Sequence, residues 1–405
     1  MVTASVIIVS HGRPDALLRA IDGVAQLDAY GFELVVVADH GGAKAVMARP
    51  DADRIKLRQF DTPNISAARN IGIATSAGEV VAFVDDDAVP EPTWLDRLIA
   101  PFDDPEVSAS GGFVLGRNGI SYQWRGSSCD AAGRSYPREV DAPLPPGHRW
   151  RTEGTCMAFR RQSLVEIGGF DEALHFFLDE TDVNRRLAGR TVVVPGAVVH
   201  HGFAASVRRR QDRVPTTLIE IGTSAAHFLT KHAPDERTKR LDEMRAEQHA
   251  RLLRHMVAGR IEPRDVRRIN ASFDKGVSMA QHREINHGLG TDTPPTFVAF
   301  LTKPPGDKVL ITGRVRDKDS LVREAHQYLQ DGLRPSLFCL TRGARYWNVK
   351  FERPGIWTHQ GGQFGRSNRG DSPVQLESFQ ARINRELARL ADVRGQLLLH
   401  STCKS

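Results

Sequence analysis

Short runs of β-branched and other apolar residues alternate with amphipathic stretches through the first hundred residues, and this alternation most narrows what the chain can fold into. The apolar runs predict strands at Ser5–Ser10, Glu33–Ala38, Ile55–Gln59 and Val80–Val84. The stretches around them predict helices at about Asp15–Ala25, Ile65–Ser76 and Pro92–Ala100. Because strands that alternate with helices pair in parallel, we expect an α/β fold with a mostly parallel central sheet.

Length and composition predict more than one folded domain. The chain has 405 residues, 40% of them hydrophobic and 26% charged, which is typical of ordered globular protein. Its formal net charge of +6 is compatible with an anionic ligand, a nucleic acid or an acidic membrane surface. The four cysteines form no CxxC pair, so they predict neither a disulfide framework nor a zinc knuckle.

The distribution of apolar residues predicts a cytoplasmic protein. The first apolar segment is too short for a signal sequence, and no run approaches the roughly 18 residues of a membrane span. Any membrane contact would then be peripheral, at the inner face of the membrane.

Polar residues follow three of the predicted strands directly. They are Ser10 to Gly12, Asp39 to Gly42, and the acidic run Asp85 to Asp87. Ligands of open α/β sheets bind beyond the carboxyl ends of the strands, so these residues should line one crevice. Clustered carboxylates repel one another unless a cation is bound, and oxygen ligands favour Mg²⁺ or Mn²⁺. A divalent metal with a phosphate-bearing ligand is therefore expected, although acids at a strand end can also form a solvated turn.

Five segments in order carry a resemblance to a known family: SVIIVSHGRP, VVVADHGG, NISAARNIGIATSAGEVVAFVDDDAVP, CMAFRRQSLVEIGGFDEALHFFLDETDVNRRLAGR and VVVPGAVVHH. Together they resemble the inverting family-two glycosyltransferases of the GT-A fold, over about residues 3 to 232. The resemblance implies metal-dependent transfer of a hexosyl-type sugar from a nucleotide-diphosphate donor to a hydroxyl of a saccharide or lipid-linked acceptor. It also implies a role in surface polysaccharide or glycolipid synthesis, with no nucleic-acid partner.

The resemblance assigns the donor side of the site. Asp39 matches the residue that binds the nucleotide base. Asp85 matches the ribose side of the DxD motif and, with Asp87, the Mn²⁺ or Mg²⁺ ligands. The other residues expected to bind the nucleotide sugar are Ser10, Arg69, Asn70 and Asp86.

A histidine often completes the metal site in this family, and two candidates follow the last strand of the resemblance. We expect His200 rather than His201, because His200 follows the apolar run directly. A histidine at such a position can also be an ordinary surface or core residue.

The catalytic base is expected within FFLDETD. Alignment with the family places Glu180 at the base position, and Asp179 remains the alternative. Asp179 can also cap the helix that follows, since carboxylates favour that end. Trp150, Gly154 and Asp182 are expected on the acceptor side, and for Trp150 and Gly154 ordinary packing is an equal alternative.

The resemblance ends near residue 232, and the remainder predicts two further parts. Residues 233–290 read as a charged helical connector with one packed face, and residues 291–405 as a small α/β domain of unknown role. The Gly-rich THQGGQFGRSNRGDS lacks the spacing of a Walker or dinucleotide loop and predicts an irregular loop.

Two other functions are compatible with parts of the pattern. A sugar-phosphate nucleotidylyltransferase would need a Gly-rich basic loop after its first strand, and SHGRPDALL has only one glycine and one arginine there. A non-catalytic module that binds a nucleotide sugar or polysaccharide would not need acids in both Asp85–Asp87 and Asp179–Asp182.

Overall fold

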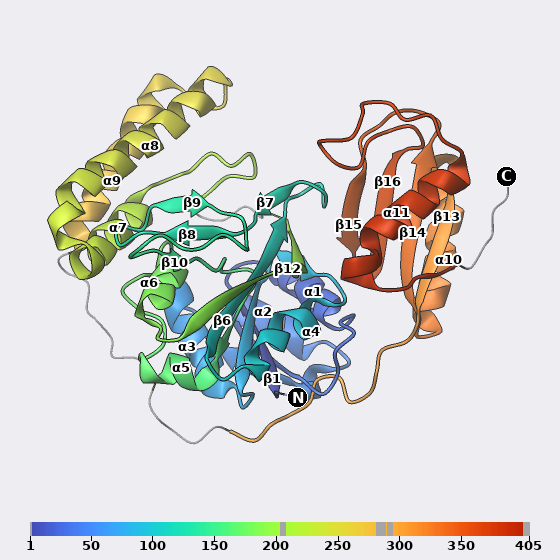
Figure 1. Ribbon diagram of the computed structural model, residues 1–405, viewed down its shortest axis with the longest axis horizontal. Coiled ribbons are helices and arrows are strands. Elements are labelled where there is room, and N and C mark those ends of the chain that lie inside the picture. Colours follow the sequence, from blue (N-terminus) through green and yellow to red (C-terminus); the bar gives the residue numbers. More distant parts are fainter. Residues whose placement is uncertain (1, 203–207, 281–288, 290–294, 400–405) are drawn as a thin grey trace.

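The computed structural model describes residues 2–202, 208–280, 289 and 295–399, and it shows two sheet-containing domains with a helical segment between them (Figure 1). The main sheet has the strand order β3-β2-β1-β4-β11-β6-β12-β5. Its first four strands in this order are parallel, whereas β11 runs antiparallel to both β4 and β6. The predicted α/β class with a mostly parallel central sheet is confirmed.

The strands of the main sheet follow the predicted apolar runs closely where those runs are β-branched. They are β1 (Ala4–Ser10), β2 (Glu33–Ala38), β3 (Ile55–Gln59), β4 (Val80–Asp85), β5 (Ala88–Pro90), β6 (Val107–Leu115), β7 (Tyr122–Trp124), β11 (Met157–Arg160) and β12 (Arg190–His201). The helices around them are α1 (Pro14–Val24), α2 (His40–Met47), α3 (Ile65–Thr75), α4 (Trp94–Ile99), α5 (Arg161–Glu166) and α6 (Asp179–Arg186).

Two apolar cores fix this sheet between helices. On one face, Leu17 and Ile21 of α1 and Trp94 of α4 pack against the strands. On the other face, Ile73 of α3 and Leu164 of α5 do the same. Both faces are thus covered, which is the condition under which parallel strands are stable. Because β1, β2 and β4 are parallel, their carboxyl ends lie at the same edge of the sheet.

The molecule also has a small three-stranded sheet, whose strands precede β11 along the chain, and three helices that come after β12. The sheet orders β10 (Arg149–Trp150), β8 (Ser127–Cys129) and β9 (Ser135–Pro137). The helices are α7 (Ile219–His232), α8 (Arg237–Val257) and α9 (Pro263–Met279).

The segment predicted as a helical connector shares a buried apolar core with α7 and with the chain before α6. Phe228, Leu252 and Phe273 from the three helices share a buried cluster with Leu178, the residue that precedes α6. This segment is therefore packed against the edge of the predicted active site instead of only linking two domains.

The C-terminal domain has a five-stranded sheet in the order β15-β16-β14-β13-β17. Its elements are β13 (Lys308–Arg314), α10 (Lys318–Gln330), β14 (Arg334–Thr341), β15 (Asn348–Glu352), β16 (Ile356–Gly362), α11 (Phe379–Arg394) and β17 (Leu398–Leu399). The predicted strand, helix, strand unit is present. The prediction of an irregular loop was wrong for the first part of the Gly-rich segment, since Thr358–Gly362 lies in β16.

One glycine of this segment, Gly361, allows a close contact with a buried side chain. A side chain on Gly361 would meet the buried ring of Trp347 at 2.5 Å. Gly361 therefore permits the close approach of Trp347 within this domain.

The C-terminal domain is held to the main domain by a buried ion pair. Arg394, at the end of α11, makes two parallel contacts of 2.7 and 2.8 Å with Glu91, which follows β5. Both side chains are 1% exposed. Burial favours protonated Glu91, but Arg394 and His200 outweigh it and lower the pKa of Glu91 to about 2. Glu91 therefore stays charged at neutral pH.

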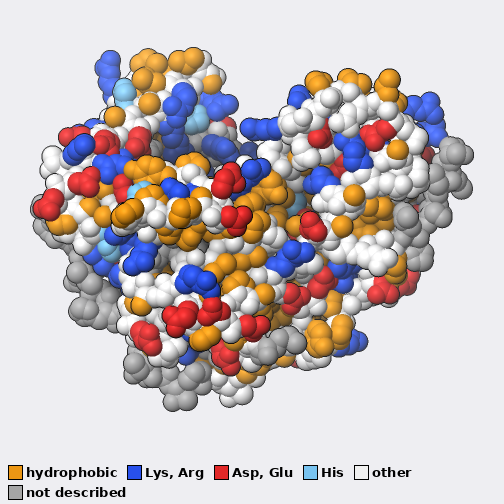
Figure 2. All heavy atoms as spheres, viewed as in Figure 1, with side chains coloured by type: hydrophobic (Ala, Val, Ile, Leu, Met, Phe, Trp, Pro, Cys, Tyr) orange, Lys and Arg blue, Asp and Glu red, His pale blue; other side chains and the backbone are white. Residues whose placement is uncertain are grey.

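The outer surface shows how these parts are arranged. Helices α8 and α9 rise on one side and the C-terminal domain on the other, and the surface between them is hollowed (Figure 2). Lys and Arg side chains gather on the α8 side of this hollow. Within the described residues, no helix is long and apolar enough to cross a membrane.

The Arg394–Glu91 pair predicts a measurable cost for its loss. Arg394→Met leaves the charge of Glu91 buried without its guanidinium, so we expect about 3 to 5 kcal/mol of destabilisation. Urea unfolding followed by tryptophan fluorescence measures this, because Trp347 and Trp357 are buried in the C-terminal domain. Arg316→Met, at an exposed pair with Asp317, is the control and should change stability by less than about 1 kcal/mol. Equal stability of the two variants would contradict the proposed importance of the pair.

Candidate active site

The three acids that follow Val84 lie at the carboxyl end of β4 but have different surroundings. Asp86 is fully buried, accepts a hydrogen bond of 2.7 Å from Ser10 and forms an ion pair of 2.7 Å with Arg13. Burial raises the pKa of Asp86 to about 7, although Arg13 opposes the shift. Asp85 keeps 26% of its side chain exposed. Ser10 and Asp86 therefore support the loop from within, whereas Asp85 faces the open side.

A histidine joins two of these acids in a candidate metal site. One donor atom each of Asp85, Asp87 and His201 lie within 4.8 Å of one another. His201 Nε2 is 3.1 Å from Asp87 Oδ1, and its Nδ1 is 3.2 Å from Gln123 Oε1. If Nδ1 donates to Gln123, Nε2 keeps its lone pair toward the acids, as a metal-binding imidazole requires. Two carboxylates and one imidazole fit a divalent cation such as Mn²⁺.

The expectation that His200 completes this cluster was wrong in its geometry. Adjacent residues of a strand point to opposite faces, so His200 on β12 is directed away from Asp87. Its Nε2 lies 2.7 Å from Glu91, and its ring packs against Trp357 of the C-terminal domain. The apolar run ended at the right place, but strand alternation decides which of the two neighbours reaches the acids.

Asp39 lies at the end of β2, as predicted, and it also begins α2. Its two carboxylate oxygens accept hydrogen bonds of 3.0 Å from the backbone N–H groups of Gly12 and Gly42. The carboxylate therefore fixes the loop after β1 and caps α2. Its predicted role toward a nucleotide base stays a prediction.

Arg69 links the metal cluster to the predicted base region. Its side chain is 3% exposed and contacts the carboxylate of Asp179, with Asp85 Oδ1 at 3.6 Å. Its second amino group donates to the carbonyl oxygen of Gly154 at 3.2 Å. A side chain on Gly154 would meet this guanidinium at 2.7 Å. Gly154 therefore makes room for Arg69, and its expected contact with an acceptor stays a prediction.

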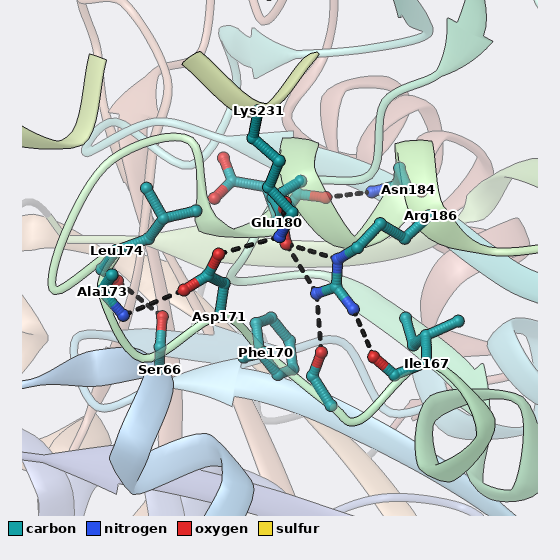
Figure 3. Close-up of polar contacts among 12 residues, drawn as sticks. Ser66, Ile167, Phe170, Asp171, Ala173, Leu174, Glu180, Asn184, Arg186 and Lys231 are labelled. Carbon is teal, nitrogen blue, oxygen red and sulfur yellow. Dashed lines mark hydrogen bonds and ion pairs between the residues drawn. The ribbon is translucent and has the colours of Figure 1, made fainter. Parts of the chain in front are cut away.

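Asn70 and Asp182 both make buried polar contacts within the protein. Asn70 is buried, exchanges hydrogen bonds with the backbone of Phe170 and donates one of 2.9 Å to Glu172. Asp182 is fully buried and contacts Arg186, Lys231 and His232. Figure 3 shows Arg186 and Lys231 converging beneath the first turn of α6, where Lys231 also reaches Asp171. These contacts anchor α6 to α7, and the predicted role of Asp182 toward an acceptor stays a prediction.

The two candidate bases occupy the first turn of α6. Leu178, with a left-handed φ of 66°, holds the N-cap position, so Asp179 is not the cap residue that the sequence allowed. Asp179 is 3% exposed and faces Arg69, whereas Glu180 lies 3.2 Å from Arg151. Carboxylates in the first turn are also favoured by the helix dipole.

The protonation of this pair favours Glu180 as the charged member. Burial and the neighbouring Glu180 charge raise the pKa of Asp179 well above its usual range, although Arg69 opposes them. Burial acts on Glu180 in the same direction, but Arg151 and a hydrogen bond from Asp179 outweigh it and lower the pKa of Glu180. Glu180 is therefore the more acidic member of the pair and the one that is charged at neutral pH.

Arginines and one acid that the sequence analysis did not single out complete the site. Arg13 forms an ion pair of 3.4 Å with Asp87, and the charge of Arg209 interacts with the same carboxylate. Arg151 contacts both Glu153 and Glu180. Arg13 follows β1 within the same polar stretch as Ser10, so the rule of strand ends could have found it. Arg151 and Glu153 lie in irregular chain after β10, where no period of the sequence marks them. Trp150 lies on β10, directly before Arg151, and is half-buried. Its predicted role toward an acceptor stays a prediction.

The fold and the cluster together define an α/β domain with a candidate divalent-cation site at the carboxyl ends of its strands. The model of the family described as "Glycosyl transferase family 2" matches residues 5–168, which lie within this domain.

Curated relatives match the first half of the chain. The chain is 28% identical over 242 residues to an O-antigen biosynthesis protein, RfbC, of Myxococcus xanthus, covering 52% of this chain and 18% of that protein. It is 29% identical over 214 residues to a pre-mycofactocin glycosyltransferase of Mycobacterium tuberculosis, covering 50% and 43% respectively. The match thus spans less than half the length of either relative.

Solved structures show weaker similarity. A structure of GalNAc-T7 with UDP, GalNAc and Mn²⁺ gives a TM-score of 0.44 at 18% identity, covering 57% of this chain and 48% of that one. A mannosyltransferase from Pyrobaculum calidifontis in complex with GDP-Man and Mn²⁺ gives 0.42 at 16% identity, covering 69% and 88%.

The position of His201 generates a test of the metal cluster. His201→Gln removes the imidazole beside Asp87 and should weaken Mn²⁺ binding at least about tenfold, as even changes around metal ligands do. His200→Gln is the matched control, because glutamine can still bond Glu91 and the residue points to the other face. Electron paramagnetic resonance of Mn²⁺ titrated into each variant gives the affinities. Equal losses in both variants, or none in either, would contradict the assignment of His201.

Proposed function

We propose that the chain is a metal-dependent, inverting glycosyltransferase that moves a hexosyl-type sugar from a nucleotide-diphosphate donor to a hydroxyl of a saccharide or lipid-linked acceptor. The observation that carries this proposal is the placement of the ionised Glu180 beyond the Asp85, Asp87 and His201 cluster, with Arg69 between the two. A single displacement needs both parts: a site for the leaving diphosphate and a base for the attacking hydroxyl.

The donor would bind at the carboxyl ends of β1, β2 and β4. Asp39 borders the place for the base, and Asp85 is the most exposed of the three acids for a ribose hydroxyl. Asp85, Asp87 and His201 would hold the cation, which when bound would neutralise negative charge on the leaving diphosphate. Arg13 and Arg209, both close to Asp87, add positive charge at the same end of the site.

Glu180 would accept the proton of the acceptor hydroxyl as its oxygen attacks the anomeric carbon from the side opposite the diphosphate. Arg151 keeps Glu180 ionised and limits its rotation through the 3.2 Å contact. Asp179 would act through Arg69 as a positioning residue. One displacement inverts the anomeric configuration, so no covalent nucleophile is needed. The family match and the O-antigen relative support a role in polysaccharide or glycolipid synthesis.

The base assignment can be tested by an isosteric change. Glu180→Gln should lower turnover of a nucleotide sugar at least about 100-fold, the usual contribution of a general base, while nucleoside diphosphate binding stays unchanged. Consumption of a panel of nucleotide sugars with p-nitrophenyl glycosides as acceptors, followed by nuclear magnetic resonance, measures turnover and the product's anomeric configuration. Glu106→Gln, which changes an exposed acid well separated in sequence from Glu180, is the control.

Two outcomes would contradict parts of this proposal. An active Glu180→Gln variant would move the base to Asp179. A product that retains the donor's anomeric configuration would rule out a single displacement.

A further inference from the structure

A cavity of about 360 Å³ lies beside α6, between the small sheet and helices α7 and α8. Its walls include Ser135 of β9, Ile221 of α7, and Met244 and Gln248 of α8. Most of these walls come from residues beyond 168, outside the family match. The cavity is therefore formed largely by the part of the chain that follows the family match.

The cavity reaches the candidate base through two wall residues. Arg151 lines it, and the same guanidinium contacts Glu180 at 3.2 Å. Leu178 also lines it and directly precedes Asp179. Phe177 and Leu178 both have left-handed φ values, 79° and 66°, which residues other than glycine adopt at a cost and which often mark ligand sites. A molecule in the cavity would thus lie beside Arg151, one side chain away from the proposed base Glu180.

The chemistry of the walls favours a ligand that is polar at its edges and apolar on a face. Phe177, Leu178, Ile221 and Met244 supply apolar surface, and charged groups lie beside them. A sugar ring offers the same combination, with hydroxyls around its rim and C–H groups on its faces. A cavity of this size falls within the usual range for small-molecule sites.

The charges of the walls are paired, which argues against a phosphorylated ligand. Arg134 contacts Glu236 at 2.9 Å and Glu243 at 3.0 Å, and Arg240 contacts Glu247 at 2.7 Å. Arg151 is similarly engaged by Glu153 and Glu180. Carboxylates and guanidiniums held in this way can still bond hydroxyls, but they leave no excess positive charge for an anion.

We propose that this cavity is the acceptor subsite and that it takes the terminal sugar of an uncharged saccharide. The proposal rests on the proposed glycosyltransferase function and adds where the acceptor binds and which part of the chain selects it. Helices α7 and α8 would then determine acceptor specificity, while the donor is bound by the family domain.

The test fills the cavity from its rim. Gln248→Trp places a large ring on α8 at a half-buried wall position, and His249→Trp places the same ring on the adjacent, exposed position outside the cavity. Saturation-transfer nuclear magnetic resonance with p-nitrophenyl glycosides of neutral hexoses and of hexuronic acids, on the full chain with Mn²⁺ and a nucleoside diphosphate, reports binding. We expect neutral glycosides to bind wild type and the His249 variant alike, and Gln248→Trp to weaken binding at least about tenfold.

Nucleoside diphosphate binding in the same samples separates this proposal from the proposed function. If the nucleotide binds but no neutral glycoside does, or if only hexuronic acids bind, the cavity proposal is overturned and the donor site stands. Unchanged glycoside binding in Gln248→Trp would likewise overturn it. If no nucleotide binds to any sample, the glycosyltransferase function itself fails, and the acceptor role of the cavity with it.

Discussion

The structure depends on one recurring interaction, the sharing of one arginine between two carboxylates. Arg13 bridges Asp86 and Asp87, Arg69 lies between Asp85 and Asp179, and Arg151 joins Glu153 to Glu180. Without these guanidiniums, six acids at one edge of the sheet would repel one another in a poorly hydrated setting. The guanidiniums offset part of this charge, and Asp85 and Asp87 remain beside His201 in the candidate site for a divalent cation. The same contacts tie strand ends that are distant in sequence to the first turn of α6.

A second consequence concerns the C-terminal domain, which is integrated with the candidate active site through β12. His200 and His201 are adjacent on this strand. One contacts Glu91 and Trp357 at the domain interface, and the other faces Asp87. Glu91 is in turn held by Arg394 from α11. The interface and the candidate metal site thus share one strand, so disruption of the interface is expected to disturb the position of His201.

Much of the fold could be predicted because it depends on local patterns. Apolar runs such as SVIIVS and ELVVVA locate β1 and β2, and the rule of strand ends locates Asp39 and Asp85 to Asp87. What could not be predicted depends on side-chain direction and distant contacts. His201 replaces His200 because strands alternate, Asp182 is captured by Lys231 and His232 from α7, and Asn70 faces Phe170. Arg151 and Glu153 lie in irregular chain, and only the folded structure brings them to Glu180.

The central claim is that the carboxyl ends of β1, β2 and β4 bind a nucleoside diphosphate together with a divalent cation. Calorimetric titration of uridine, guanosine and thymidine diphosphates into the full chain, with and without Mn²⁺, tests it most directly. The account predicts that at least one of them binds in the presence of Mn²⁺ and much more weakly in its absence. Binding of none of the three, or binding that is equally strong without the metal, would contradict it.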